Sequence, residues 1–168
     1  MYTFSEKRPR AVASAREISY DRGKGGDGVI EILEQTPGLV VCIKPVGVHA
    51  QGEAEADLPA LLKRQLGCEI YPVHRLDQAV GGVMVFAKTA PAAAKLSQAI
   101  AGGALQKEYL AVLERSPERA EGELSDLLFH DRFKNKTYVV SKERKGVKKA
   151  SLSYRVVAEA DGLCLVHV

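Results

Sequence analysis

The segment His74-Arg75-Leu76-Asp77 holds the residues of this sequence best suited to chemistry. It precedes the pair Gly81-Gly82 and an apolar run at residues 83–87. This pattern predicts one carboxylate at the mouth of a buried strand, with a glycine turn behind it. A single acid near a cation suits a nucleophile or an electrostatic stabiliser, whereas a glycoside hydrolase needs two carboxylates. No motif supplies the second one, so hydrolysis of that kind is disfavoured.

Ordinary structural roles are open for the same residues. Asp77 could cap a helix or pair with Arg75, and Lys88 could be a surface charge at the end of a strand. Tyr109, on the inward face of its expected strand, would usually be a packed aromatic whose hydroxyl bonds a nearby carbonyl. The residue types alone therefore leave structure and catalysis as alternatives.

The elements that must position these residues follow from periodicity and capping. Strands are expected at residues 29–33, 39–44, 82–87, 106–113, 136–141, 150–159 and 163–168. Asp57 is expected to cap a helix over residues 58–66 that Gly67 closes, and Thr89 to cap a second helix that ends at Gly102. Asp161-Gly162 is a hairpin signal. The prediction is an α+β fold with a mixed, mainly antiparallel central sheet and flanking helices.

Size and composition set the class of protein. A chain of 168 residues, 46% hydrophobic and 27% charged, suits one globular domain. No apolar run is long enough for a membrane span, and the first residues have no apolar core like that of a secretory signal. We expect a cytoplasmic protein, with residues 1–28 as a disordered leader and one domain from residue 29 to 168.

Positive charge is concentrated in one stretch. Residues 131–149 hold eight basic and two acidic side chains, a net +6 in a chain whose total is +3. Such a stretch could neutralise phosphates, and its alternative is a solvated turn kept soluble by lysine. Lys145, Lys148 and Lys149 are the candidate phosphate contacts within it.

Cysteine and histidine give no metal signal. Cys42, Cys68 and Cys164 form no C-x-x-C pair, and the four histidines lack the spacing of metal ligands. Cys42 and Cys164 lie in apolar runs and are expected in the core. No metal is predicted.

Three segments, in order, resemble the RluA family of pseudouridine synthases. Residues 40–48 are similar to its lysine-proline-glycine segment, residues 74–88 to its signature block H-R-L-D-x-x-x-G-G-x-x-x-x-A-K, and residues 107–111 to the segment that carries its tyrosine. The resemblance covers about residues 29–168. It implies the pseudouridine synthase catalytic-domain fold and an isomerase that converts chosen uridines of ribosomal or transfer RNA to pseudouridine, without a cofactor.

The resemblance also implies roles for individual residues. Asp77 is the essential aspartate, as nucleophile, stabiliser of developing positive charge or proton acceptor, and Tyr109 lies against the uracil. Arg75 occupies the gap left by the extruded uridine, a role in which a planar guanidinium can stack. We expect RNA as the partner of a monomer, with no membrane.

Two departures from the family pattern are visible. The family usually has Thr-Ser-Gly where this chain has Val80-Gly81-Gly82. It also continues beyond the position of Val168 with a Thr-Gly-Arg-x-His-Gln-Ile-Arg segment. We expect no S4-like domain before residue 29. We therefore expect a C-terminally truncated member, the N-terminal two-thirds of a catalytic domain, whose activity and stability are reduced. The alternative function is a non-catalytic RNA-binding remnant.

Overall fold

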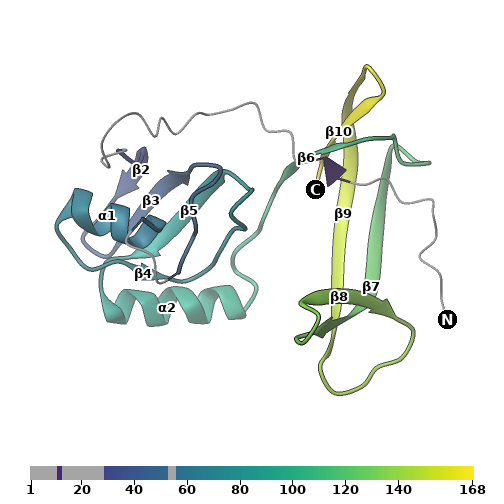
Figure 1. The fold of residues 1–168 in the computed structure, drawn as a ribbon. Helices are drawn as coiled ribbons and strands as arrows, with labels where there is room; N and C mark the ends of the chain where they lie inside the picture. The colour runs from purple at the N-terminus through teal and green to yellow at the C-terminus, as the bar shows by residue number, and fades with distance from the viewer. Residues whose placement is uncertain (1–10, 13–28, 53–55) are drawn as a thin grey trace. The chain divides into compact units, whose positions relative to one another are not determined.

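The computed structural model describes residues 11–12, 29–52 and 56–168. The chain forms two units, one made of residues 13–106 and the other of residues 1–12 with 107–168. Figure 1 shows a small sheet with two helices in the first unit and a long-stranded sheet in the second. The expected α+β class with mainly antiparallel strands is confirmed. The expected single central sheet is replaced by two separate sheets, one in each unit.

The first unit has a four-stranded antiparallel sheet in the order β2-β3-β5-β4. Its strands are β2 (Ile32–Gln35), β3 (Leu39–Lys44), β4 (Tyr71–Pro72) and β5 (Gly82–Ala87). β3 and β5 pair over their whole length, from Leu39 opposite Ala87 to Lys44 opposite Gly82. The apolar run before Lys88 is thus an interior strand, as predicted.

The two helices begin and end where the sequence predicts. Helix α1 (Leu58–Leu66) has Asp57 as N-cap, which accepts a hydrogen bond from Ala60 N, and Gly67 in the left-handed conformation as C-cap. Helix α2 (Ala90–Ala101) has Thr89 as N-cap and Gly102 as C-cap. The two helices differ in how far they are buried: α1 buries three leucines, whereas α2 buries no residue fully.

The core of the first unit lies between α1 and one face of its sheet. Its fully buried members alternate along the strands and recur along the helix. They include Ile30, Val40, Cys42, Leu58, Leu62, Met84 and Phe86. The first strand begins later than predicted because the side-chain amide of Gln65 takes both backbone groups of Ile30, at 2.8 Å and 2.9 Å, in place of a neighbouring strand.

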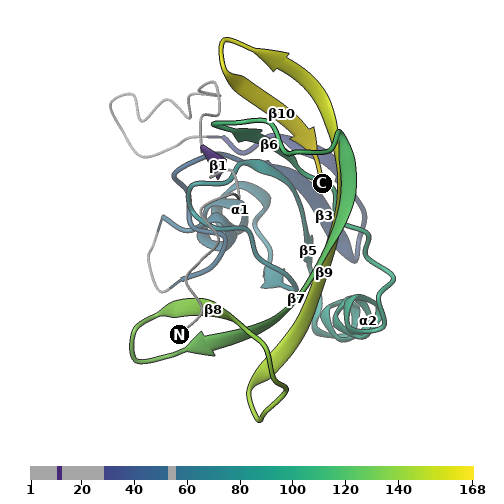
Figure 2. The same ribbon diagram turned by 90° about the vertical axis from the view of Figure 1, so that its right-hand side faces the viewer.

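The second unit is a six-stranded antiparallel sheet in the order β1-β6-β10-β9-β7-β8. Its strands are β1 (Ala11–Val12), β6 (Leu110–Leu113), β7 (Glu121–Asp131), β8 (Lys136–Val140), β9 (Val147–Ala160) and β10 (Leu163–His167). Figure 2 shows β7 and β9 running side by side as long, curved strands. Asp161 and Gly162, both with positive φ, form the tight turn between β9 and β10 that the sequence predicts.

Three expectations from the sequence differ from what the structure shows in this unit. β7 was not predicted, because it exposes side chains on both faces and so lacks a clear alternation of apolar residues. β9 begins at Val147, so Lys148 and Lys149 lie in a strand instead of the turn. Ala11 and Val12 pair with Leu113 and Val112, whereas the rest of the expected leader at residues 1–28 lies outside the described residues.

Candidate active site

Asp77 lies on the loop that joins β4 to β5, and its neighbours anchor that loop. His74 Nε2 accepts a hydrogen bond of 3.1 Å from Val85 N in the middle of β5. Leu76 packs against the core of the unit. Val80 N donates to Asp77 O at 3.0 Å and closes a turn just after the aspartate. The backbone of Asp77 is therefore held on both sides while its side chain is exposed.

A second loop, after β3, braces this turn. Gly47 N donates to Gln78 O at 2.8 Å, and Gln78 Nε2 donates to Gly47 O at 3.1 Å. The two bonds join neighbours of Asp77 to the loop after Lys44 in a reciprocal pair. Order at Asp77 therefore depends on residues about thirty positions earlier in the chain.

Lys44 is the unexpected member of the site. It occupies the same face of β3 as Val40 and Cys42 and is 0% exposed. Its Nζ donates to Val48 O at 2.7 Å, to Pro45 O at 2.9 Å and to Gln78 O at 3.3 Å, so its three donors meet three carbonyls. The ammonium thus joins the loop after β3 to the residue next to Asp77.

The charge of Lys44 is coupled to that of Asp77. Burial lowers the pKa of Lys44 below its usual value, because the charged form is moved out of water. The negative charge of Asp77 acts in the opposite direction and raises that pKa.

Gly81, which departs from the family pattern, and Gly82, which keeps its glycine, both have a structural reason. A Cβ at Gly81 would lie 3.1 Å from Val46 Cγ2 and 3.4 Å from Lys44 O, so the loop passes close to the end of β3. Gly82 has φ +151°, which side chains rarely adopt. The close approach of the two loops therefore favours glycine at both positions.

Arg75 and Asp77 do not take the structural roles that were open to them. Both are exposed, and Asp77 caps neither helix. Within the described part of the chain, no ion pair of Arg75 with Asp77 occurs. The guanidinium and the carboxylate are both available to solvent.

Tyr109 belongs to the second unit and is held at the end of β6. Its backbone N and O both pair with Val168, each at 2.8 Å. The side chain is 38% exposed, and no hydrogen bond of its hydroxyl is found among the described residues. The expected ordinary role, a packed aromatic with a bonded hydroxyl, does not fit this position.

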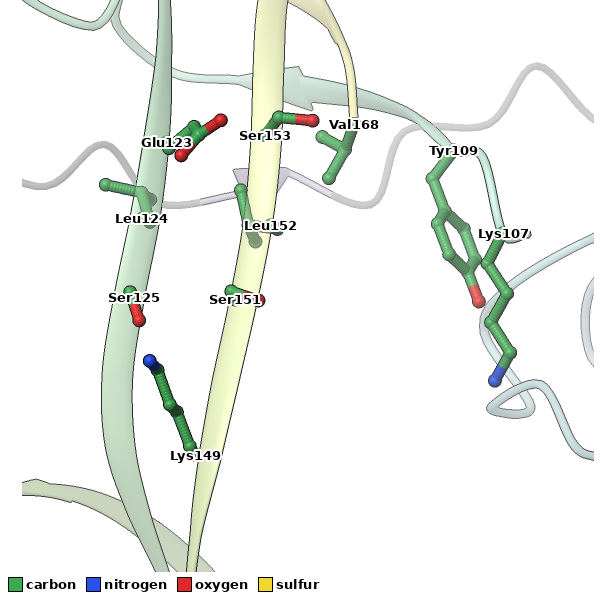
Figure 3. Close-up of a pocket in the computed structure, with 10 residues that line it drawn as sticks. All are labelled: Lys107, Tyr109, Glu123, Leu124, Ser125, Lys149, Ser151, Leu152, Ser153 and Val168. Atoms are coloured by element: carbon green, nitrogen blue, oxygen red, sulfur yellow. The ribbon is translucent and has the colours of Figure 1, made fainter. Parts of the chain in front are cut away.

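A hollow of about 1000 Å³ adjoins Tyr109 in the same unit (Figure 3). Strands β7 and β9 contribute Glu123, Leu124, Ser125, Lys149, Ser151, Leu152 and Ser153, and the segment around Tyr109 contributes Lys107 and Val168. In Figure 3 the Lys149 side chain extends toward Ser125. The hollow combines two ammonium groups, a phenol and three small hydroxyl side chains.

The candidate RNA-binding lysines occupy different places. Lys145 lies in the exposed turn before β9, whereas Lys148 and Lys149 are the second and third residues of that strand. The Arg144 guanidinium lies 4.5 Å from the centre of the Phe129 ring, so a cation–π contact ties this turn to β7. Of the three lysines, Lys149 lines the hollow beside Tyr109.

The cysteines are spread over both units. Cys42 and Cys164 are fully buried, as predicted, and burial raises the pKa of the Cys42 thiol to about 11. Cys68 is half-buried just after α1. Among residues 11–12, 29–52 and 56–168, no group of three or more His, Cys, Asp or Glu side chains could hold a metal ion. In the same residues, no helix is long and apolar enough to cross a membrane.

Burial predicts an order of thiol reactivity. At pH 8 a maleimide reagent is expected to label Cys68 well before Cys42 or Cys164, because the reagent must reach the sulfur and needs the thiolate. Mass spectrometry of the labelled peptides measures this order, and labelling in denaturant provides the control in which all three sites react. Equal rates for Cys42 and Cys68 in the folded protein would contradict the buried position of Cys42.

Comparison with known proteins decides the family. The family model described as RNA pseudouridylate synthase matches residues 38–167, which include the Asp77 loop, Lys44 and Tyr109. The chain belongs to the RNA pseudouridylate synthase family. The resemblance of its three segments to the RluA type is confirmed.

Named relatives agree with this family. The chain is 40% identical over 91 residues to "RNA pseudouridine synthase 7" of Oryza sativa subsp. japonica, covering 52% of this chain and 23% of the relative. It is 35% identical over 89 residues to "tRNA pseudouridine synthase C" of Pasteurella multocida, covering 50% and 37%. The chain thus spans well under half the length of these two relatives.

The fold agrees as well. The solved structure of human RNA pseudouridylate synthase domain containing 4 superposes with a TM-score of 0.66 at 25% identity, over 82% of this chain and 57% of that one. The structure of human RNA pseudouridylate synthase domain containing 1 gives a TM-score of 0.71 at 16% identity, over 86% and 60%. The expected catalytic-domain fold is therefore confirmed.

Proposed function

We propose that this protein isomerises uridine in RNA to pseudouridine and that Asp77 is the essential carboxylate. The observation that carries the proposal is the placement of Asp77. Its backbone is fixed by bonds on both sides, its carboxylate is exposed, and the buried ammonium of Lys44 bonds the carbonyl of the next residue, Gln78. Such a carboxylate is preorganised for a substrate that comes from solution.

The reaction needs one bond to break and another to form. The glycosidic N1–C1′ bond breaks, the base turns, and its C5 forms a bond to C1′. The proton on C5 then leaves to a base, and N1 takes up a proton. Asp77 would act at C1′, as nucleophile or as stabiliser of positive charge, or would take part in proton abstraction. These steps require no cofactor.

Tyr109 and Arg75 would each have a separate role in the reaction. The exposed phenol of Tyr109 offers a face for the uracil and a group for the final proton removal. Arg75 would fill the gap that the extruded uridine leaves, since extrusion costs a few kcal/mol. The basic stretch at residues 131–149 would supply contacts to phosphate.

The substrate is inferred to be ribosomal or transfer RNA in the cytoplasm. The name of the Pasteurella relative, "tRNA pseudouridine synthase C", favours transfer RNA. Nothing in the proposed chemistry separates the two RNA classes, because the residues assigned to it act on the nucleotide itself. Purified RNA of each class therefore belongs in the same assay.

The test is the appearance of product. RNA is incubated with the protein, digested to nucleosides and analysed by chromatography for pseudouridine. Time-dependent formation of pseudouridine in one RNA class is expected. Tight binding to RNA without any product would instead favour the second candidate function, a non-catalytic RNA-binding protein. The net charge of +6 at residues 131–149 is the observation that supports this candidate.

Arg75→Lys is expected to lower the rate of conversion about tenfold or more, although the charge is kept. Lysine lacks the planar guanidinium that stacks and contacts phosphate at the same time. Rates measured at several RNA concentrations separate this effect from binding. Because the Arg75 side chain is exposed, the substitution should not disturb folding, and a lowered rate would report on the reaction itself. An unchanged rate would remove Arg75 from the proposed role.

A further inference from the structure

The residue before Tyr109 and the residue before Val168 form an ion pair. His167 Nε2 lies 3.2 Å from Glu108 Oε2, so the imidazole N–H donates to the carboxylate. The backbones of Tyr109 and Val168 bond each other in both directions. Because successive side chains of a strand point to opposite faces, the ion pair lies on the face of the sheet opposite to the Tyr109 ring.

The register of β6 and β10 accounts for this ion pair. His167 lies directly opposite Leu110, the first residue of β6. Glu108 lies two residues before Leu110, so it is the diagonal neighbour of His167, at a distance of about 7–8 Å that long side chains can span. The side chain opposite His167 on β9 is the cation Arg155, so no acid competes with Glu108 from that position. The ion pair thus extends the contact between the two strands beyond the end of β6.

Tyr109 lies where this contact is needed. β1 pairs with β6 at Val112 and Leu113 only, so in the part of the chain that the structure describes Tyr109 has a strand neighbour on one side alone. The first unit ends at Gln106, so the chain enters this sheet just before Tyr109. A strand end with a single neighbour opens more readily than the interior of a sheet.

β10 is the ordered partner in this contact. It pairs with β6 on one side and with β9 on the other, and Figure 2 shows it beside β6. Cys164 and Val166 on this strand are 0% and 2% exposed. A bond from Glu108 to this strand therefore restricts the motion of the segment that carries Tyr109.

We propose that Glu108 and His167 are positioning residues that hold Tyr109 in place for the reaction. Neither residue is assigned a contact with the substrate, and both act through the strand end that carries the phenol. The inference rests on the proposed function, which places Tyr109 against the uracil. The side chains of His167 and Glu108 are 38% and 73% exposed, and an exposed ion pair changes an equilibrium constant by at most about fivefold. The expected effect is therefore local and leaves the fold intact.

Amide hydrogen exchange followed by NMR measures this opening. Glu108→Lys removes the ion pair and places a cation beside His167, so exchange at the amides of Tyr109 and Val168 is expected to become about five- to tenfold faster. Glu108→Lys combined with His167→Glu restores opposite charges and is expected to regain most of the protection. Glu159→Lys makes the same charge change at an exposed position of β9, where no ion pair occurs within the described residues, and should leave both amides unchanged.

The rate of conversion is the second readout. At saturating RNA the single-turnover rate of Glu108→Lys is expected to fall about twofold or more, because the phenol spends less time in position. The charge-swapped double variant should regain this rate, and Glu159→Lys should keep it. A thermal melt checks the fold of each variant.

Three results would overturn the positioning role alone. They are unchanged exchange in Glu108→Lys, equal changes in Glu108→Lys and Glu159→Lys, and faster exchange with an unchanged rate of conversion. No recovery in the charge-swapped variant would also contradict it, since the two side chains would then not act as a pair. A wild-type protein that forms no pseudouridine would overturn the proposed function and this role with it. The exchange data do not depend on activity, so the two failures are distinguishable.

Discussion

Asp77→Asn is expected to reduce the conversion of uridine to pseudouridine by roughly 10³-fold or more while the protein stays folded. Asparagine has nearly the same shape but no charge, so it can neither attack C1′ nor stabilise a cation there. The bonds that hold the loop use the backbone of Asp77 and the side chains of His74 and Gln78, none of which changes. The loss is therefore expected in the rate and not in the fold. Nucleoside analysis and a thermal melt measure the two properties.

Asp57→Asn is the matched control for this variant. Asp57 belongs to the same unit but caps helix α1, where asparagine caps about as well. Activity and melting temperature should both stay close to the wild-type values. If both variants lost activity alike, a general loss of charge or stability would explain the result better than a role for Asp77 in the reaction.

Lys44→Met is expected to lower the free energy of unfolding by about 2–4 kcal/mol. Methionine fits the length of the side chain but removes the ammonium donor from three carbonyls. Gln78 O keeps its bond from Gly47 N and Pro45 O its bond from Val48 N, whereas Val48 O keeps no other donor among the described residues. Each buried group left unsatisfied costs about 1–3 kcal/mol. Part of this is offset because no buried charge remains. Denaturant titration measures the change.

Lys88→Met is the control, at the residue just after β5. Lys88 is half-buried and donates one hydrogen bond of 3.1 Å, to Thr36 O, far along the chain from the Asp77 loop. Its loss should cost about 1 kcal/mol or less. A destabilisation by Lys44→Met no larger than this would contradict the bracing role of Lys44. Faster amide exchange at Gln78 and Val80 is expected in Lys44→Met alone.

The lowered pKa of Lys44 gives the same variant a pH signature. Between that lowered pKa and 10.5 the unfolded chain binds a proton that the native protein does not, so the contribution of Lys44 to stability rises with pH. The raised pKa of Cys42 acts oppositely between 9.0 and about 11, because there the native thiol keeps its proton. Subtracting the curve of Lys44→Met cancels the Cys42 contribution. The difference should rise with pH, and a flat or falling difference would contradict the burial of a charged Lys44.

Local signals in the sequence were sufficient to predict the helices and the interior strand β5 of the first unit. The caps Asp57, Gly67 and Thr89 define helix ends through short-range hydrogen bonds, and the continuous apolar run at residues 82–87 indicates an interior strand. The signature block was enough to identify the family and to select Asp77. These features depend on residues within a few positions of one another, which is why they can be read without a structure.

Features that depend on distant pairing could not be predicted in this way. β7 has polar and apolar side chains on both faces, and its place is set by its pairing with β9. Lys44 looked like an ordinary strand end, although its position two residues after Cys42 on an alternating strand places it on the core face. The pairing of Leu127 with Lys149 and of Leu128 with Lys148 assigns the two lysines to opposite faces. Sequence alone treats them as one basic stretch.

The most direct test of the account measures binding and conversion in one sample. The wild-type protein and Asp77→Asn are each held at saturating concentration over a uridine-containing RNA substrate, and the single-turnover rate of pseudouridine formation is followed. Equal affinity for RNA, with product formed by the wild-type protein only, is the result that the account predicts. Formation of pseudouridine by Asp77→Asn at the wild-type rate would contradict it.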